Sequence, residues 1–148
     1  NKEFDLVCMF DVLEHIDDDL GTLESLKNAM LPNSSLVITV PAYQWLWSYH
    51  DVVSQHKRRY NLTQLTQLCK KAGFTITYGT YFNTFLFPLI SVIRGIQNLF
   101  GKKSGTDIFL PPKFINWLFK TIFASERYML PWLSLPFGVS VLVVVKKN

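Results

Sequence analysis

Two short apolar runs, separated by one helix-length segment, constrain the fold of this chain more than any other feature. Phe4–Phe10 and Ser35–Pro41 are nearly continuous in apolar residues, which is typical of strands that are buried on both faces of a parallel sheet. Between them, leucines recur at helical spacing from Leu20 to Leu31, and Asp17–Asp19 offer an N-cap. A strand, a helix and a second strand in this order predict a βαβ unit, and so an α/β fold.

The rest of the chain continues the alternation of helix and strand. After a long connection, 42–60, the patterns predict these elements in order: a helix from Asn61 that stops at Gly73, a strand over 74–82, helices over 85–100 and 112–124, and a last strand over 139–145. The segment 101–107 is polar and is expected to be a mobile loop. A structureless connection as long as 42–60 is uncommon unless it is functional.

Composition limits the class of protein. Of the 148 residues, 49% are apolar, which suffices for a packed core, and the formal charge of +4 is below that of a dedicated nucleic-acid binder. Cys8 and Cys69 fall in segments expected to be buried and form no disulfide framework, so a reducing cytoplasm is expected. No run reaches the roughly 20 apolar residues of a membrane span. The start at Asn1, directly before a strand, suggests a fragment.

Candidate ligand-binding residues follow the two apolar strands. In open α/β sheets, ligands bind at the carboxyl ends of the strands. Asp11-Val12-Leu13-Glu14-His15 comes after the first strand, and Pro41-Ala42-Tyr43 with the aromatic connection comes after the second. These two segments are therefore the places to look for a site.

The first of these segments carries a resemblance to a known family. Phe4-Asp5-Leu6-Val7, followed by Phe10 to Ile16, resembles the fourth-strand motif of class I S-adenosylmethionine-dependent methyltransferases, of the type 11/12-like group. Segment 31–41 is similar to that family's fifth strand, with Asn33 and Ser34 in place of the usual glycines. Segments 56–60, 72–74 and 136–140 are similar to later motifs of one bacterial branch.

The resemblance implies a fold and a domain arrangement. It predicts the carboxy-terminal half of one domain, with the fourth to seventh strands of a Rossmann-like methyltransferase sheet and an antiparallel last strand. Residues 1–83 are expected to form the βαβ core and third strand, 84–136 a helical insertion, and 137–148 the final strand. The family's glycine-rich cofactor loop is not among the motifs of this sequence, so the fragment is expected to bind cofactor weakly and to be inactive alone.

The resemblance also implies the cofactor, S-adenosyl-L-methionine, and the residues that would bind it. These are Phe10, Asp11, Val12 and Leu13, directly after the first strand. A helix N-cap is the alternative for Asp11, and core packing is the alternative for Val12 and Leu13. Methyl transfer needs alignment and, for a hydroxyl acceptor, a base; no metal is expected, and no ligand cluster stands out in the sequence.

Catalytic and acceptor-binding candidates come from both strand ends. His15 and His56 are the candidate bases, with a structural hydrogen bond as the alternative for the Glu14–His15 pair. Arg58 and Arg59 would bind a phosphate or carboxylate of the acceptor, or else form salt bridges to the acidic first helix. Tyr43, Trp47 and Tyr60 complete the candidate acceptor site, with packing as the alternative for the aromatic residues.

Other functions and partners stay open at this point. The leading interpretation is methyl transfer to a small-molecule or lipid-linked acceptor. The alternative is a non-catalytic interaction or membrane-surface module that uses the apolar helices 85–124, with a cytoplasmic, membrane-peripheral location. An NAD-dependent enzyme and a nucleic-acid methyltransferase are disfavoured by the motifs. An unpaired edge on the first strand would favour a homodimer.

Overall fold

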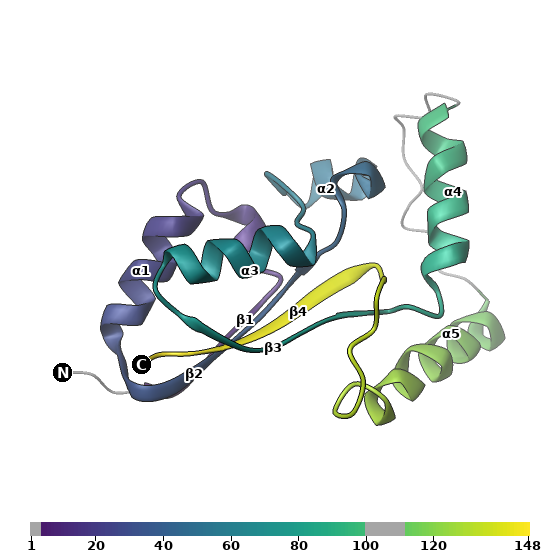
Figure 1. Cartoon of the computed structure of the whole chain (residues 1–148). Coiled ribbons are helices and arrows are strands. Elements are labelled where there is room, and N and C mark those ends of the chain that lie inside the picture. The colour runs from purple at the N-terminus through teal and green to yellow at the C-terminus, as the bar shows by residue number, and fades with distance from the viewer. Residues whose placement is uncertain (1–3, 100–111) are drawn as a thin grey trace.

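The computed structural model describes residues 4–99 and 112–148, and these residues form a mixed four-stranded sheet with helices on one face (Figure 1). The elements, in chain order, are β1 (Phe4–Phe10), α1 (Asp19–Ala29), β2 (Met30–Pro41), α2 (Tyr49–Val53), α3 (Leu62–Lys71), β3 (Thr75–Phe82), α4 (Phe87–Leu99), α5 (Lys113–Ser125) and β4 (Ser140–Lys146). The connections also contain three 3₁₀ turns, at Leu13–His15, Gln44–Leu46 and Glu126–Tyr128. The expected mobile loop 101–107 lies outside the described residues.

The strand order is β1-β2-β4-β3. β1 pairs with β2 in parallel, with Cys8 opposite Val37, and this confirms the predicted βαβ unit. β4 lies between β2 and β3 and is antiparallel to both. The three remaining strands therefore point the same way, and their carboxyl ends meet at one edge. The expected α/β class and the expected antiparallel last strand are both confirmed.

Local sequence signals fix the helix ends. The Asp18 carboxylate accepts a hydrogen bond from the Gly21 amide at 2.9 Å, which caps α1. Asn61 and Gln64 exchange two backbone-to-side-chain hydrogen bonds at the start of α3, which is a capping box. Gly73, at a φ of 83°, ends α3 as predicted, and Asn33, at a φ of 64°, takes the left-handed conformation expected where the family has glycine.

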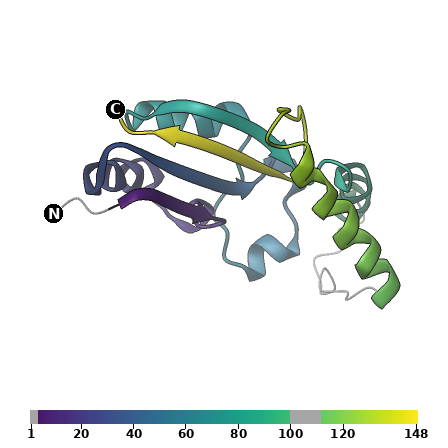
Figure 2. The same ribbon diagram turned by 90° about the horizontal axis from the view of Figure 1, so that it is seen from below.

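The core lies between the sheet and the layer of α1 and α3. Alternate residues of the two central strands point into it, and they meet buried residues of both helices: Leu36, Ile38, Val40, Val141, Val143, Val145, Leu23, Leu65 and Cys69. Figure 2 shows the four strands side by side with both helices behind them. No helix of the described residues covers the opposite face of the sheet.

The expectation that β1 is buried on both faces is wrong for this chain. Met9 packs in the core, but Phe4, Leu6 and Phe10 point to the uncovered face, and Leu6 and Phe10 are 57% and 60% exposed. Cys8, expected to be buried, is exposed on the same face, whereas Cys69 is buried as expected. The reason is topological: β1 is an edge strand, so one edge and one face of it have no neighbour among the described residues.

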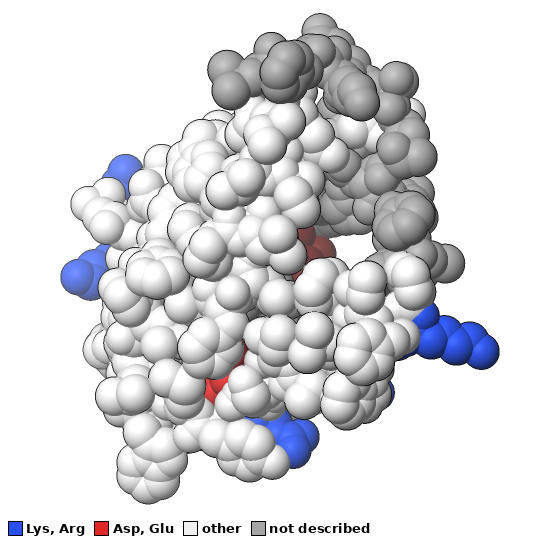
Figure 3. Space-filling view, turned by 90° about the vertical axis from the view of Figure 1, so that its right-hand side faces the viewer, with Lys and Arg blue, Asp and Glu red and all other residues white. Residues whose placement is uncertain are grey.

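α4 and α5 stand beyond the end of the sheet instead of covering a face (Figure 1). α5 has no buried side chain, and Trp117 and, further on, Trp132 are largely exposed. Figure 3 shows this end of the molecule, where uncharged side chains fill most of the surface and Lys and Arg lie at its rim. Within the described residues, no helix is both long and apolar enough to cross a membrane.

Candidate functional site

All three parallel strands end close to a residue with a left-handed backbone. Asp11 follows β1 at a φ of 51°, Tyr43 follows β2 at 53°, and Asn83 follows β3 at 58°. Such conformations are costly for residues other than glycine and cluster at functional sites. Together they turn the chain sharply at the carboxyl edge of the sheet, where α/β proteins bind their ligands.

Asp11 is held at this edge by β2. Its amide donates to the Thr39 carbonyl at 3.0 Å, and the Thr39 hydroxyl donates to the Asp11 carboxylate at 3.3 Å. The 3₁₀ turn that follows has Val12 as its N-cap and no side-chain capping bond. Asp11 is therefore not a helix N-cap, which was the alternative role expected for it. The Asp11 side chain stays exposed to solvent.

The other three predicted cofactor residues divide into two groups. Phe10 and Val12 have exposed side chains at the end of β1, where a ligand can reach them. Leu13 is fully buried and belongs to the hydrophobic core. The packing alternative therefore describes Leu13, whereas Phe10, Asp11 and Val12 form an accessible group.

Glu14, His15 and His56 form a compact cluster behind Asp11. Glu14 Oε1 lies 3.9 Å from Nε2 of both histidines, and the two imidazole rings meet edge to face with centroids 4.7 Å apart. Glu14 is completely buried, whereas the side chains of His56 and His15 are 11% and 40% exposed. The two predicted catalytic histidines are therefore brought together, with the cluster open to solvent at His15.

Glu14 occupies an unusual environment for a carboxylate. Neither of its oxygens accepts a hydrogen bond of standard geometry from the described residues. Burial raises the pKa of Glu14 to about 7, although its own backbone amide partly favours the charged form. A structural hydrogen bond, expected as the alternative role of Glu14, is thus not made through the carboxylate. The anchoring contact is instead its backbone carbonyl, which accepts from the Lys57 amide at 2.9 Å.

Asp51 organises the loop that carries His56. It is fully buried and accepts hydrogen bonds from His56 Nδ1 at 2.8 Å and from the Ser48 amide at 2.8 Å. It also accepts two bonds from Arg59, from Nε at 2.7 Å and from Nη2 at 2.9 Å. Burial alone would raise the pKa of Asp51, but the bonds from Arg59 and His56 outweigh it and lower the pKa to about 2.

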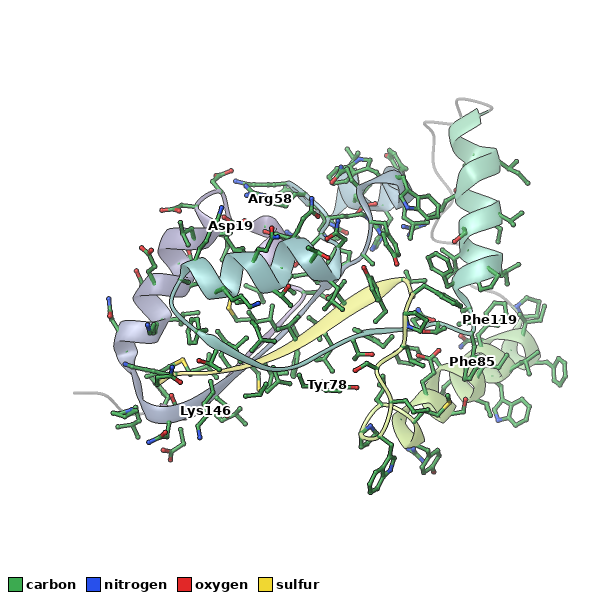
Figure 4. All side chains as sticks on the ribbon, in the orientation of Figure 1. Asp19, Arg58, Tyr78, Phe85, Phe119 and Lys146 are labelled. Carbon is green, nitrogen blue, oxygen red and sulfur yellow. The ribbon has the colours of Figure 1, made fainter. Side chains whose placement is uncertain are left out.

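The two arginines have intramolecular partners. Arg59 is buried, and its third donor, Nη1, binds the Ala42 carbonyl at 3.0 Å, so its guanidinium holds the loop together. Arg58 binds Asp19 of α1 at 3.0 Å, as the salt-bridge alternative predicts (Figure 4). Tyr60 is buried and donates to the same Asp19 carboxylate at 2.8 Å; burial and this bond both raise the pKa of Tyr60. A groove of about 460 Å³ runs alongside these residues, between the loop and α3.

Aromatic rings extend the carboxyl edge toward α4. Tyr43 stacks on Tyr81 with centroids 5.1 Å apart, and it also meets Trp45 and Phe87 at 5.8 Å. Burial and the contact with Tyr81 raise the pKa of Tyr43, so its hydroxyl stays protonated. Trp47 is partly exposed in the same connection. Of the predicted acceptor-binding aromatics, Tyr43 and Trp47 are thus partly exposed, whereas Tyr60 is buried and only borders the groove beside α3.

A comparison with known protein families identifies the fold that carries this site. A family model described as a methyltransferase domain matches residues 1–78, more than half of the chain. The chain belongs to this methyltransferase family. The matched residues include β1, β2 and the whole Glu14–His56 cluster. The resemblance to class I methyltransferases noted in the sequence is thereby confirmed.

Solved methyltransferases share the fold at low sequence identity. A putative methyltransferase from Bacillus halodurans C-125 superposes with a TM-score of 0.57 at 13% identity, covering 99% of this chain and 65% of its own. A SAM-dependent methyltransferase from Archaeoglobus fulgidus superposes with a TM-score of 0.53 at 18% identity, and the match covers 99% of this chain and 60% of that protein. Phosphoethanolamine N-methyltransferase 2 from Haemonchus contortus was solved in complex with S-adenosyl-L-methionine. It superposes with a TM-score of 0.53 at 18% identity, and the match covers 99% of this chain and 34% of that protein. This chain therefore spans between a third and two thirds of these structures. Among curated proteins, none matches significantly.

Sequence reasoning missed the role of one residue of this candidate site. The connection that carries His50 and Asp51 was expected to contribute acceptor-binding groups, but Asp51 was given no role as the acceptor that holds both His56 and Arg59. A signal was present: Ser48 followed three residues later by Asp51 is a capping-box pattern, and it marks the start of α2. The pattern marks the helix, but it does not reveal that the carboxylate is buried.

Proposed function

We propose that this chain is the acceptor-side part of an S-adenosylmethionine-dependent methyltransferase that acts on a hydroxyl group of a small-molecule or lipid-linked acceptor. The observation that carries the proposal is the grouping of Glu14, His15 and His56 at the carboxyl edge of a methyltransferase sheet. An accessible group at the end of β1, made of Phe10, Asp11 and Val12, lies next to this cluster in the chain and supports cofactor binding there.

For methyl transfer, the protein has to align the acceptor with the methyl group and remove the proton of the acceptor hydroxyl. The acceptor oxygen forms a bond to the methyl carbon, and the carbon–sulfur bond breaks with its electron pair left on sulfur. The hydroxyl proton is lost at the histidine cluster, for which His15 and His56 are the catalytic candidates. Asp51 is a positioning residue, because its bond to Nδ1 orients the His56 ring.

The open side of the sheet supports the further proposal that this chain supplies only part of the cofactor site. Leu6 and Phe10 expose apolar surface at the β1 edge, and the family's glycine-rich cofactor loop has no counterpart in the sequence. An additional strand beside β1, with helices over the uncovered face, would bury these side chains and complete the pocket. The chain alone is then expected to bind S-adenosylmethionine weakly and to be inactive.

Isothermal titration and a transfer assay test this function. The intact protein is expected to bind S-adenosylmethionine and to transfer its labelled methyl group to a hydroxyl compound in a panel that also contains amines and carboxylates. The 148-residue chain alone is expected to show no micromolar binding. Micromolar binding by the chain would refute the incomplete site, and an intact protein that does not bind the cofactor would refute the function itself.

A second candidate function, docking on an anionic lipid surface, is favoured by the α4–α5 end. Basic residues on and beside α5, Lys113, Lys120 and Arg127, accompany exposed aromatic side chains, while the acidic Glu126 is buried. Aromatic and aliphatic side chains flanked by Lys and Arg are typical of helices that lie in the membrane interface. Such docking is compatible with methyl transfer to a lipid-linked acceptor.

A further inference from the structure

We propose that Glu14, His15 and His56 form a binding site for a divalent first-row transition-metal ion of the zinc class, with the acceptor hydroxyl as a further ligand. One atom from each of the three side chains can be chosen so that all three lie within 4.8 Å of one another. Two imidazoles and one carboxylate are a recurrent ligand set for zinc and for non-haem iron.

The distances are those of a site that has to tighten only slightly. Glu14 Oε1 lies 3.9 Å from each imidazole Nε2, which is too long for a hydrogen bond. Ligands of a tetrahedral ion with bonds of about 2.0–2.1 Å are roughly 3.3 Å apart, so the separations, which are at most 4.8 Å, have to shorten by at most roughly 1.5 Å. The partly exposed His15 side chain has room for such a change of rotamer.

The hydrogen-bond pattern of the cluster leaves a position for a cation. Asp51 is already the acceptor for Arg59 and Ser48, so its bond with His56 Nδ1 requires that Nδ1 carries the proton. His56 Nε2, the ring nitrogen that is not bonded to Asp51, faces the Glu14 carboxyl group at 3.9 Å. These two ligand atoms face one another with no hydrogen-bond donor between them among the described residues, so a cation placed between them would give both a partner.

The surroundings match those of known metal ligands. A histidine that binds a metal commonly donates its other ring nitrogen to a carboxylate, which fixes the tautomer and raises the basicity of the ligand. Asp51 stands in this relation to His56, and Arg59 holds Asp51 in place from the other side. Glu14, completely buried and without a hydrogen bond of standard geometry from the described residues, supplies the charge that offsets the ion.

The metal gives the acceptor class a physical basis, and this part rests on the proposed methyl transfer. Three protein ligands leave at least one coordination position open, and a bound ion sharply lowers the pKa of an oxygen ligand there. With the ion bound, His15 and His56 hold the ion instead of accepting the proton. The acceptor hydroxyl then loses its proton to solvent at the exposed His15 side, and its oxygen attacks the methyl carbon as the carbon–sulfur bond breaks. An amine bound to the same ion would lose the lone pair it needs, so oxygen is the expected nucleophile.

Metal binding is measured without cofactor or acceptor, so its outcome is independent of the proposed activity. The tag-free protein is stripped with a chelator, titrated with Zn²⁺ by calorimetry, and titrated with Co²⁺ while the visible absorption bands of the bound ion are recorded. One equivalent is expected to bind. Glu14→Gln, His15→Gln and His56→Gln are each expected to weaken metal binding by at least about tenfold. Loss of a residue that only supports a ligand already costs about tenfold, so loss of a ligand itself should cost no less.

The sequence supplies a matched control, because the chain has three histidines and His50 is the one outside the cluster. His50→Gln removes an imidazole close to His56 but outside the cluster, and it is expected to leave the affinity unchanged. His15→Gln is the decisive variant, since its side chain is partly exposed and circular dichroism can verify the fold. Equal weakening by His50→Gln and His15→Gln, or no stoichiometric binding by the wild type, would overturn the site. Metal binding without any S-adenosylmethionine binding by the intact protein would leave the site standing and refute the methyl transfer.

Discussion

Arg59 donates two hydrogen bonds to Asp51, from Nε to Oδ1 at 2.7 Å and from Nη2 to Oδ2 at 2.9 Å, and both side chains are buried. This pair holds the connection between β2 and α3 against the carboxyl edge of the sheet. It is also the contact that orients Asp51 toward His56. The stability of the loop and the geometry of the histidine cluster therefore depend on the same carboxylate.

Removing one partner of this pair is expected to be costly. Asp51→Asn leaves a buried guanidinium without its counter-charge, so the free energy of unfolding should fall by about 3–5 kcal/mol. Arg58→Gln is the matched control, because Arg58 is the adjacent residue and its ion pair with Asp19 is partly exposed; it should cost less than about 1 kcal/mol. Urea denaturation measures both, and equal losses would contradict the structural role given to Asp51.

Cys69 predicts a pH dependence of stability. Burial raises the pKa of its thiol from 9.0 to about 12. The unfolded chain loses this proton near pH 9 while the folded chain keeps it, so the free energy of unfolding falls as the pH rises from 9 to 12, by at most about 4 kcal/mol. Cys69→Ala should make this slope shallower, with the part due to Tyr43 and Tyr60 left in place because their pKa values are raised as well, and the exposed Cys8→Ala should keep the full slope. Denaturation at a series of pH values tests this, and the same slope in all three proteins would contradict it.

The open edge of β1 predicts self-association of the chain. Leu6 is exposed on an edge strand that can pair with a second copy. Leu6→Lys places a charge there and removes roughly 1.5–3 kcal/mol of apolar burial, so the dimer should weaken about tenfold or more. Val92→Lys, at an equally exposed position on α4, should leave it unchanged. Sedimentation velocity separates the two, and a wild type that stays monomeric at all concentrations would refute the prediction.

The apolar α4–α5 end predicts flotation with anionic vesicles. Phe119 lies at this end together with Phe85 (Figure 4). We choose Phe119 and Phe123 of α5 for substitution by a charged residue. The Phe119→Glu/Phe123→Glu variant of the intact protein should lose most of its flotation with phosphatidylserine-containing vesicles. Val52→Glu, an exposed apolar position on α2, is the control.

Two outcomes of the flotation assay would remove the membrane proposal. The first is equal flotation of the charged variant and the wild type. The second is unfolding of the charged variant in circular dichroism, since that would assign Phe119 and Phe123 to packing. Trp117→Glu separates these cases, because this side chain is more than half exposed and its loss leaves little packing to disturb.

The sequence predicted those parts of the fold that depend on local patterns. The cap at Asn61, the stop at Gly73 and the parallel pairing of the first two apolar runs are all encoded in spacing, capping and hydrophobic period. The burial of β1 was not predictable in this way. An apolar run indicates a strand that can be buried on both faces, but whether a neighbour covers it depends on chain that does not lie next to it in sequence.

The candidate site was predicted only as a set of segments. Strand-end position identified Asp11 to His15 and the connection after β2 as the places to look. The pairing of His56 with Asp51, and the burial of Arg59 and Tyr60, arise because the connection folds back on α1 and on the end of β1. Such long-range packing leaves no periodic trace, so the residues Arg59 and Tyr60 were expected at the acceptor although the fold uses them to hold the loop.

The most direct test of the whole account is the rate of methyl transfer by the intact protein when the histidine cluster is changed. His56→Gln is expected to lower the rate by about 10²–10⁴-fold, the range typical of a group that handles the reacting proton, while the neighbouring His50→Gln keeps the wild-type rate. Full activity of His56→Gln would contradict the assignment of the reaction to the carboxyl edge of this sheet.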